Sequence, residues 1–166
     1  MKNKIPQTSQ SPAAWLSAWI ICLLLAFGTP ITGIAGPEET VKVTIQANDQ
    51  MKYDVTQIQA KPSQPVQITL KNIGTMPKVS MGHNLVVLDG KIPIEQFLEA
   101  GQTQMANNYV APEMKSYVIA STKLLGPGES DTITFKAPTT PGDYLFICSF
   151  PGHYAIGMKG VLSVKK

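Results

Sequence analysis

Short alternations of apolar and polar residues run along the chain from residue 41 to its end. An alternation with period two is typical of half-buried β-strands, because successive side chains face opposite sides of a sheet. Turns that contain glycine or proline separate these runs at fairly regular intervals. The run that begins at Leu85 is more continuously apolar than the others. We therefore predict about eight strands, at residues 41–45, 51–55, 66–72, 85–88, 117–120, 131–136, 144–147 and 160–164.

Residues 93–108 break this pattern and predict a short helix. Ile94, Phe97 and Leu98 recur at helical spacing, and glutamates occupy the opposite face. Residues 109–115 follow neither period and predict an irregular segment. About eight short strands with one helical insertion are typical of an all-β Greek-key β-sandwich or barrel, which is the fold class that we expect.

The first 35 residues have the composition of an export signal rather than of a folded domain. Two lysines near the start precede an apolar run at 13–27, and small residues at 33–35 offer a cleavage site. The apolar run has 15 residues, fewer than the roughly 20 that span a bilayer. We expect residues 1–35 to be a cleaved signal and residues 36–166 to form one periplasmic domain without stable membrane insertion. A retained anchor helix is the alternative.

The charge of the predicted domain is nearly balanced. Lys2 and Lys4 lie in the predicted signal and account for two of the 14 basic residues, all of which are lysine. The other 12 face 11 acidic residues, so the domain has a net charge near +1. Without arginine or a dense lysine cluster it has no electrostatic footprint for a phosphate backbone, which argues against nucleic acid as a partner. The lack of arginine also excludes a twin-arginine signal, so we expect metal acquisition after export of the unfolded chain.

The candidate chemistry lies in the loop 148–158, between the last two predicted strands. This loop carries Cys148, His153 and Met158, and the chain has one other histidine, His83. Two imidazoles, one thiolate and a weak thioether form the ligand set of a blue copper site. Cys148 is the only cysteine after the predicted signal, so it has no partner for an internal disulfide. Metal ligation explains this thiol in an oxidising compartment better than the alternative, a small buried hydrophobic residue.

Residues beside the candidate ligands indicate how the site would be supported. Gly82 would let the backbone approach the metal, with its carbonyl opposite Met158, the expected axial ligand. Asn84 could tie the two ligand-bearing segments together, and the backbone N–H of Phe150 could donate to the sulfur. We place Met81 in the hydrophobic core.

Each candidate ligand also has a plain structural explanation. His83 could be an ordinary loop residue, and Met158 could fill a gap in the core, as methionines often do. Both histidines of the chain, however, stand in ligand-like surroundings. Zinc is the main competing metal, but the sequence lacks the spaced ligand pairs of a structural zinc site and the adjacent general base of a catalytic one.

Several segments, in order along the chain, resemble the azurins, which are single-domain blue copper proteins of the cupredoxin family. These segments are 46–51, 70–78, 81–84, 122–126 and 148–160. The resemblance spans nearly the whole predicted domain. It implies a cupredoxin fold that holds one copper ion, with the Gly82 carbonyl as a distant fifth contact and, as ligands, His83, Cys148, His153 and Met158.

Three features depart from the azurin pattern. Four residues separate His153 from Met158, where azurins have three, so we expect an altered copper–methionine geometry and a shifted potential. The mature chain has no cysteine pair for the disulfide that azurins usually carry near the N-terminus. Leu85 stands where azurins commonly have tryptophan, which predicts different core packing.

The resemblance implies a carrier of single electrons between larger redox proteins, such as cytochromes or a terminal reductase or oxidase. His153 would present an exposed ring edge as the electron port, within a neutral apolar docking face. A nearly neutral domain fits brief encounters through a small patch. Ordinary core packing is the alternative for the residues that we assign to this face, which are Met51, Met76, Phe150, Pro151 and Ile156.

Two other functions compete with electron transfer. A copper chaperone or storage protein is the first, although such proteins tend to use exposed, labile ligands rather than a thiolate in a rigid loop. A copper-binding accessory subunit of a redox enzyme is the second, and it would need further ligands from a partner. The sequence shows neither a second histidine cluster nor a Ser–His–Asp set, so we do not expect an enzyme.

Overall fold

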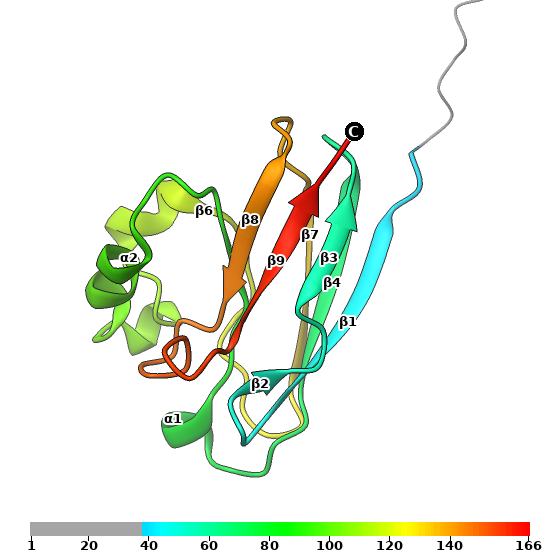
Figure 1. The fold of residues 1–166 in the computed structure, drawn as a ribbon. Helices are drawn as coiled ribbons and strands as arrows, with labels where there is room; N and C mark the ends of the chain where they lie inside the picture. Colours follow the sequence, from blue (N-terminus) through cyan, green and yellow to red (C-terminus); the bar gives the residue numbers. More distant parts are fainter. Residues whose placement is uncertain (1–37) are drawn as a thin grey trace, which may run out of the picture. The chain divides into compact units, whose positions relative to one another are not determined.

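The computed structural model describes residues 38–166, which form two β-sheets connected by loops and short helices (Figure 1). The predicted signal at 1–35, its cleavage site and the alternative of an anchor helix lie outside the described residues. Within residues 38–166, no helix has the length and apolar character needed to cross a membrane.

The strands form one sheet of four and one sheet of five. Across the first sheet the order is β2 (Lys52–Tyr53), β1 (Val41–Asn48), β4 (Pro65–Asn72) and β7 (Ser130–Lys136). Across the second the order is β3 (Gln57–Ala60), β9 (Lys159–Val164), β8 (Gly142–Ile147), β5 (Val86–Leu88) and β6 (Val118–Ser121). The pairs β1–β4 and β3–β9 are parallel and the others antiparallel, so both sheets are mixed. Two separate sheets confirm the predicted all-β sandwich rather than a closed barrel.

The main hydrophobic core is built from the inward faces of the strands. In β4, Val66, Ile68 and Leu70 are fully buried, and the residues between them are more exposed. Phe146 of β8 and Leu162 of β9 join the same core. The apolar–polar alternation forms strands here because its period matches the pleat, so that each strand can bury one complete face.

β5 is buried on both faces, as its continuous apolar run predicted. Val87 joins the main core, whereas Val86 and Leu88 belong to a second hydrophobic cluster. Phe97 from α2 (Ile94–Gly101) is fully buried in that second cluster. In Figure 1, α2 lies on the left of the molecule, with β8 and β9 between it and β1. The predicted amphipathic helix is confirmed, and it covers the outer side of β5 with its apolar face.

The shortest elements escaped prediction. Strand β3 was not predicted, because its alternation, with Ile58 and Ala60 buried, lasts only four residues. The single helical turn α1 (Lys78–Met81) was not predicted either, because it is too short to show a helical repeat.

Two 3₁₀ segments follow α2. They are η1 (Met105–Asn107) and η2 (Pro112–Tyr117), and η2 overlaps the segment predicted to be irregular. The placement of Met81 in the hydrophobic core was wrong, because this residue is half-buried at the end of α1 and no residue of that helix is buried.

Candidate metal centre

The loop between β8 and β9 folds back on itself through backbone hydrogen bonds. The N–H of Cys148 donates to the Met158 carbonyl at 3.1 Å, which brings the first and last residues of the loop side by side. The Met158 N–H donates to the His153 carbonyl at 3.0 Å, and the His153 N–H donates to the Phe150 carbonyl at 3.1 Å. The antiparallel strands therefore fix both ends of the loop, and internal bonds fix its middle.

His83 reaches the site from the segment between α1 and β5. It forms a two-way backbone bridge with Leu125, with N···O distances of 3.0 and 2.8 Å. A glycine is required before it, because a Cβ atom on Gly82 would lie 2.6 Å from the Lys78 carbonyl oxygen and 2.9 Å from Cγ of Leu124. The segment before His83 therefore passes between Lys78 of α1 and Leu124, and this gap has no room for a side chain at residue 82.

The fold brings His83, Cys148 and His153 together in the interior. One potential ligand atom from each lies within 4.8 Å of the other two. The sulfur of Cys148 is 3.4 Å from Nδ1 of His153, and the two imidazole centroids are 5.0 Å apart. All three residues are at most 2% exposed. Met158 is fully buried as well and belongs to the main core.

The polar atoms of this cluster fit a metal ion. Among the described residues, both ring nitrogens of His83 are buried and make no hydrogen bond. The carbonyl of Asn48 lies near the His83 ring and favours its protonated form, but the two do not form a hydrogen bond. A buried nitrogen without a partner costs about 1–3 kcal/mol, which metal coordination would offset. Two imidazoles and a thiol are the donors that copper and zinc take from proteins.

Burial sets the protonation of the metal-free cluster. It raises the pKa of the Cys148 thiol to about 12, although the N–H groups of Asn84 and Phe150 favour the thiolate. Burial, together with His83, lowers the pKa of His153 to about 4. Burial also lowers the pKa of His83. At neutral pH the imidazoles are therefore unprotonated, and metal binding must displace the thiol proton.

Asn84 connects the two ligand-bearing segments. Its Nδ2 donates to the Ser149 hydroxyl at 2.8 Å and to the Asn108 carbonyl at 2.7 Å, and its Oδ1 accepts from the Ser149 N–H at 2.9 Å. The Tyr53 hydroxyl donates to the carbonyl of Asn84. Asn84 is fully buried, so these bonds are shielded from water.

The partners of Asn84, which are Ser149, Asn108 and Tyr53, were not predicted from the sequence. Asn108 has a left-handed backbone, with φ of 56°, and its Oδ1 accepts from the Leu124 N–H at 2.7 Å. Asparagine tolerates this conformation better than most residues, so Asn108 at the end of the predicted helix was a usable signal. The Tyr53 contact is long-range and had no sequence signal.

The residues assigned to the docking face differ in exposure. Ile156 and Met76 are 51% and 41% exposed, and Pro151 is also exposed. Phe150, in contrast, is buried and stacks on the His153 ring with centroids 4.5 Å apart. His153 is only 2% exposed, so the expectation of an exposed ring edge was wrong. Phe150 and the surrounding loop cover the ring.

Met51 is half-buried and packs against the main core, with a left-handed backbone at φ of 54°. It ends the turn that Asn48 begins, since the Met51 N–H donates to the Asn48 carbonyl at 2.9 Å. Core packing, the alternative considered for Met51, therefore applies to its buried part, and its place in the docking face stays a prediction.

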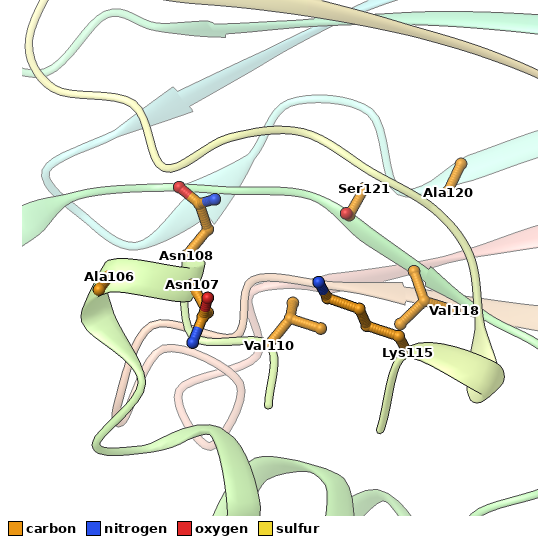
Figure 2. Close-up of a pocket in the computed structure, with 8 residues that line it drawn as sticks. All are labelled: Ala106, Asn107, Asn108, Val110, Lys115, Val118, Ala120 and Ser121. Carbon is orange, nitrogen blue, oxygen red and sulfur yellow. The ribbon is translucent and has the colours of Figure 1, made fainter. Parts of the chain in front are cut away.

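A separate pocket of about 370 Å³ lies beside the 3₁₀ segments and β6 (Figure 2). Figure 2 shows the Lys115 side chain extended along its wall, between Val110 and Val118. Lys115 is the one titratable side chain in its lining, and none of the three clustered candidate ligands borders it. The pocket therefore offers no comparable donor set.

A β-sandwich with a buried Cys–His–His cluster defines a copper protein of the cupredoxin class. The family described as "Copper binding proteins, plastocyanin/azurin family" matches residues 39–165. The chain therefore belongs to the plastocyanin/azurin family, and copper is its cofactor. The resemblance found in the sequence is confirmed.

Curated relatives support this assignment. The azurin of Pseudomonas fluorescens biotype C is 36% identical over 127 residues, which cover 75% of this chain and 98% of that protein. The outer membrane protein H.8 of Neisseria gonorrhoeae is 40% identical over 115 residues, which cover 68% of this chain. The matched region spans only 62% of the length of that relative.

Solved structures give the same fold. Auracyanin from the photosynthetic bacterium Roseiflexus castenholzii is 33% identical with a TM-score of 0.65, and the match covers 76% of this chain and 98% of that one. The azurin Az-iso2 from the methylotroph Methylomonas sp. strain J is 30% identical with a TM-score of 0.67, with the same coverage of both chains.

Proposed function

We propose that this protein carries single electrons between larger redox proteins, using one type 1 copper ion that alternates between Cu(II) and Cu(I). The observation that carries the proposal is the buried, rigidly held set of His83, Cys148 and His153. In this proposal Met158 is the weak axial ligand and the Gly82 carbonyl is a more distant contact. Copper supplies the one-electron couple.

The protein restricts the movement of the copper ligands. The backbone bonds of the loop and the Asn84 bridge fix the ligand positions from several directions. Ligands that barely move between the two oxidation states keep the reorganisation energy of electron transfer low. The N–H groups of Asn84 and Phe150 favour the thiolate form of Cys148, so they support the charge of the ligand in the loaded protein.

We assign docking to the surface above His153. The exposed members of the proposed face are Met76, Pro151 and Ile156, and a pocket of about 400 Å³ beside Pro151 adds a hollow between the loop and α2. Cytochromes or a terminal reductase or oxidase are the proposed partners. Phe150 and His153, whose rings are stacked, would form the path between partner and site, and no substrate would be transformed there.

We also place this function in the periplasm, with residues 1–35 as the export signal and residues 36–166 as the working domain. The composition of the N-terminal segment supports this placement. N-terminal sequencing of the protein recovered from a periplasmic extract tests it. A chain that keeps its first residues and stays with the membrane fraction would contradict it.

A visible spectrum after addition of Cu(II) tests the proposed function, with Cys148→Ser as the control. We expect an intense blue thiolate-to-copper band in the wild type, its absence in the variant, and reversible bleaching by a mild reductant. A colourless protein that binds Cu(I) or Zn²⁺ without redox cycling would instead indicate a chaperone or store. Blue colour that appears only with a partner subunit would indicate an accessory role.

A further inference from the structure

The short strand β2 contacts both segments that carry the candidate ligands. Its two residues point to opposite sides, as neighbours on a strand do. The Tyr53 hydroxyl donates to the carbonyl of Asn84, directly after His83. Lys52 Nζ donates to the carbonyl of Ile156 at 2.8 Å, two residues before Met158. A strand of two residues therefore braces the site from both sides.

The segment 154–157 forms the interval between His153 and Met158, and Tyr154 at its start packs against the second hydrophobic cluster. The Ile156 side chain is 51% exposed and cannot anchor the segment by packing. Internal hydrogen bonds close it, from the Gly157 N–H to the Tyr154 carbonyl at 2.9 Å and from the Ile156 N–H to the Gly152 carbonyl at 3.4 Å. At the end of the segment, the Lys159 N–H of β9 donates to the Gly157 carbonyl at 2.9 Å. Among the described residues, Lys52 is the side chain that hydrogen-bonds to this segment from a distant element.

Gly157 makes the position of this carbonyl consequential. Its φ of 95° is a conformation that glycine adopts freely, so steric contacts of a side chain do not fix the peptide between Ile156 and Gly157. Two hydrogen bonds hold this peptide instead, from its N–H to the Tyr154 carbonyl and from Lys52 to its carbonyl. Lys52 Nζ lies 3.5 Å from the place where a Cβ of Gly157 would be. The ammonium group thus sits against the Ile156–Gly157 peptide, immediately before Met158.

We propose that Lys52 is a positioning residue for the copper site, which fixes the Ile156–Gly157 peptide and thereby the approach of Met158 to the metal. This inference rests on the proposed function, because it takes Met158 as the axial ligand. Lys52 also places a positive charge beside the loop, which favours the reduced site, but an exposed charge is strongly screened.

Lys159 provides a matched control for that charge. Its Nζ lies 4.5 Å from the centroid of the Tyr154 ring, so it also borders the segment. It is exposed, as Lys52 is, and its side chain contacts the Tyr154 ring rather than the Ile156 carbonyl. Lys159→Met therefore removes a nearby charge, while the Lys52 hydrogen bond to the Ile156 carbonyl and the backbone hydrogen bond from residue 159 to Gly157 stay in place.

The experiment compares the wild type with Lys52→Met, Lys52→Arg and Lys159→Met, all loaded with copper. We expect Lys52→Met to change the intensity ratio of the two thiolate-to-copper absorption bands and to lower the reduction potential by more than Lys159→Met does. Lys52→Arg should restore the wild-type ratio, because arginine can donate to the same carbonyl. In the metal-free protein, hydrogen exchange of the Gly157 amide should rise about threefold to tenfold in Lys52→Met, as expected for loss of one hydrogen bond.

Equal spectra and equal potential shifts for Lys52→Met and Lys159→Met would overturn the proposal, because charge alone would then account for the effect. Wild-type behaviour of Lys52→Met in all measurements would overturn it as well. Either result could be obtained with a wild type that is blue and bleaches reversibly, so failure of this inference is distinct from failure of the proposed function. A wild type that never turns blue would count against both.

Discussion

The side chains of the buried cluster are uncharged until a metal arrives. Burial holds Cys148 as a thiol and both histidines as neutral rings, so the metal-free interior contains no isolated charge. Asn84 satisfies the polar groups around them. These two facts lead to separate expectations, one for the hydrogen-bond bridge and one for pH.

Replacement of Asn84 by alanine should destabilise the protein. It leaves the Ser149 N–H without its buried acceptor and removes one of the two donors to the Asn108 carbonyl, which we expect to cost about 2–4 kcal/mol in the free energy of unfolding. Urea denaturation of the metal-free variant measures this loss. Asn107→Ala is the control, because the half-buried Asn107 side chain bonds only to Gln104 and should cost less than about 1 kcal/mol. Equal losses in the two variants would contradict a special role for Asn84.

The metal-free protein should lose stability on both sides of neutral pH. The pKa of His153 is about 4 when folded and 6.5 in its ordinary state, so the unfolded chain takes up a proton first and stability falls from pH 6.5 towards 4. The pKa of Cys148 is about 12 when folded and 9.0 ordinarily, so stability also falls from pH 9 towards 12. Denaturation midpoints at pH 5, 7 and 10 check this. Bound copper should remove the alkaline loss, since the thiolate is then the ligand.

Strands and helices differ in how clearly the sequence marks them. β4 and β5 were readable because a strand that buries one face alternates and a strand that buries both faces is apolar throughout. β3 and α1 were not, since four residues are too few to establish a period. At the site, the ligand-type residues were visible from their chemistry, whereas the Tyr53 and Lys52 contacts depend on how β2 folds over two distant segments.

α2 should contribute to stability without setting the colour of the site. Phe97 is fully buried in the cluster outside β5, so Phe97→Ala should cost about 3–4 kcal/mol of stability. We expect the position of the blue band in the copper-loaded variant to stay unchanged, because Phe97 packs in a cluster that contains none of the candidate ligands. Thermal denaturation and a visible spectrum test both statements. A shifted band would show that α2 helps to shape the metal site.

The domain combines a large hydrophobic core with a metal site in which the ring nitrogens of His83 have no hydrogen-bond partner within residues 38–166. The core between the sheets does not depend on the metal, so we expect the metal-free protein to fold. Copper binds only the folded arrangement, so it should add to that stability by mass action.

Removal of copper should therefore lower the unfolding temperature without abolishing cooperative unfolding. At free copper of 100 times the dissociation constant, the expected difference is about 2.7 kcal/mol. Calorimetry of the loaded and chelator-treated protein measures it, and Cys148→Ser should respond far less to copper. An unfolded metal-free chain would contradict this expectation.

The hydrogen bond between the first and last residues of the ligand loop has an evolutionary consequence. Because the Cys148 N–H is held by the Met158 carbonyl, the two ends stay together however many residues lie between them. An inserted residue can bulge outward at Tyr154–Gly157, where the chain meets solvent, without separating the ends. The number of residues between the ligands therefore does not determine where the ligands lie around the metal. Loop length can then drift between lineages and tune the metal's electronic properties while the ligand set survives.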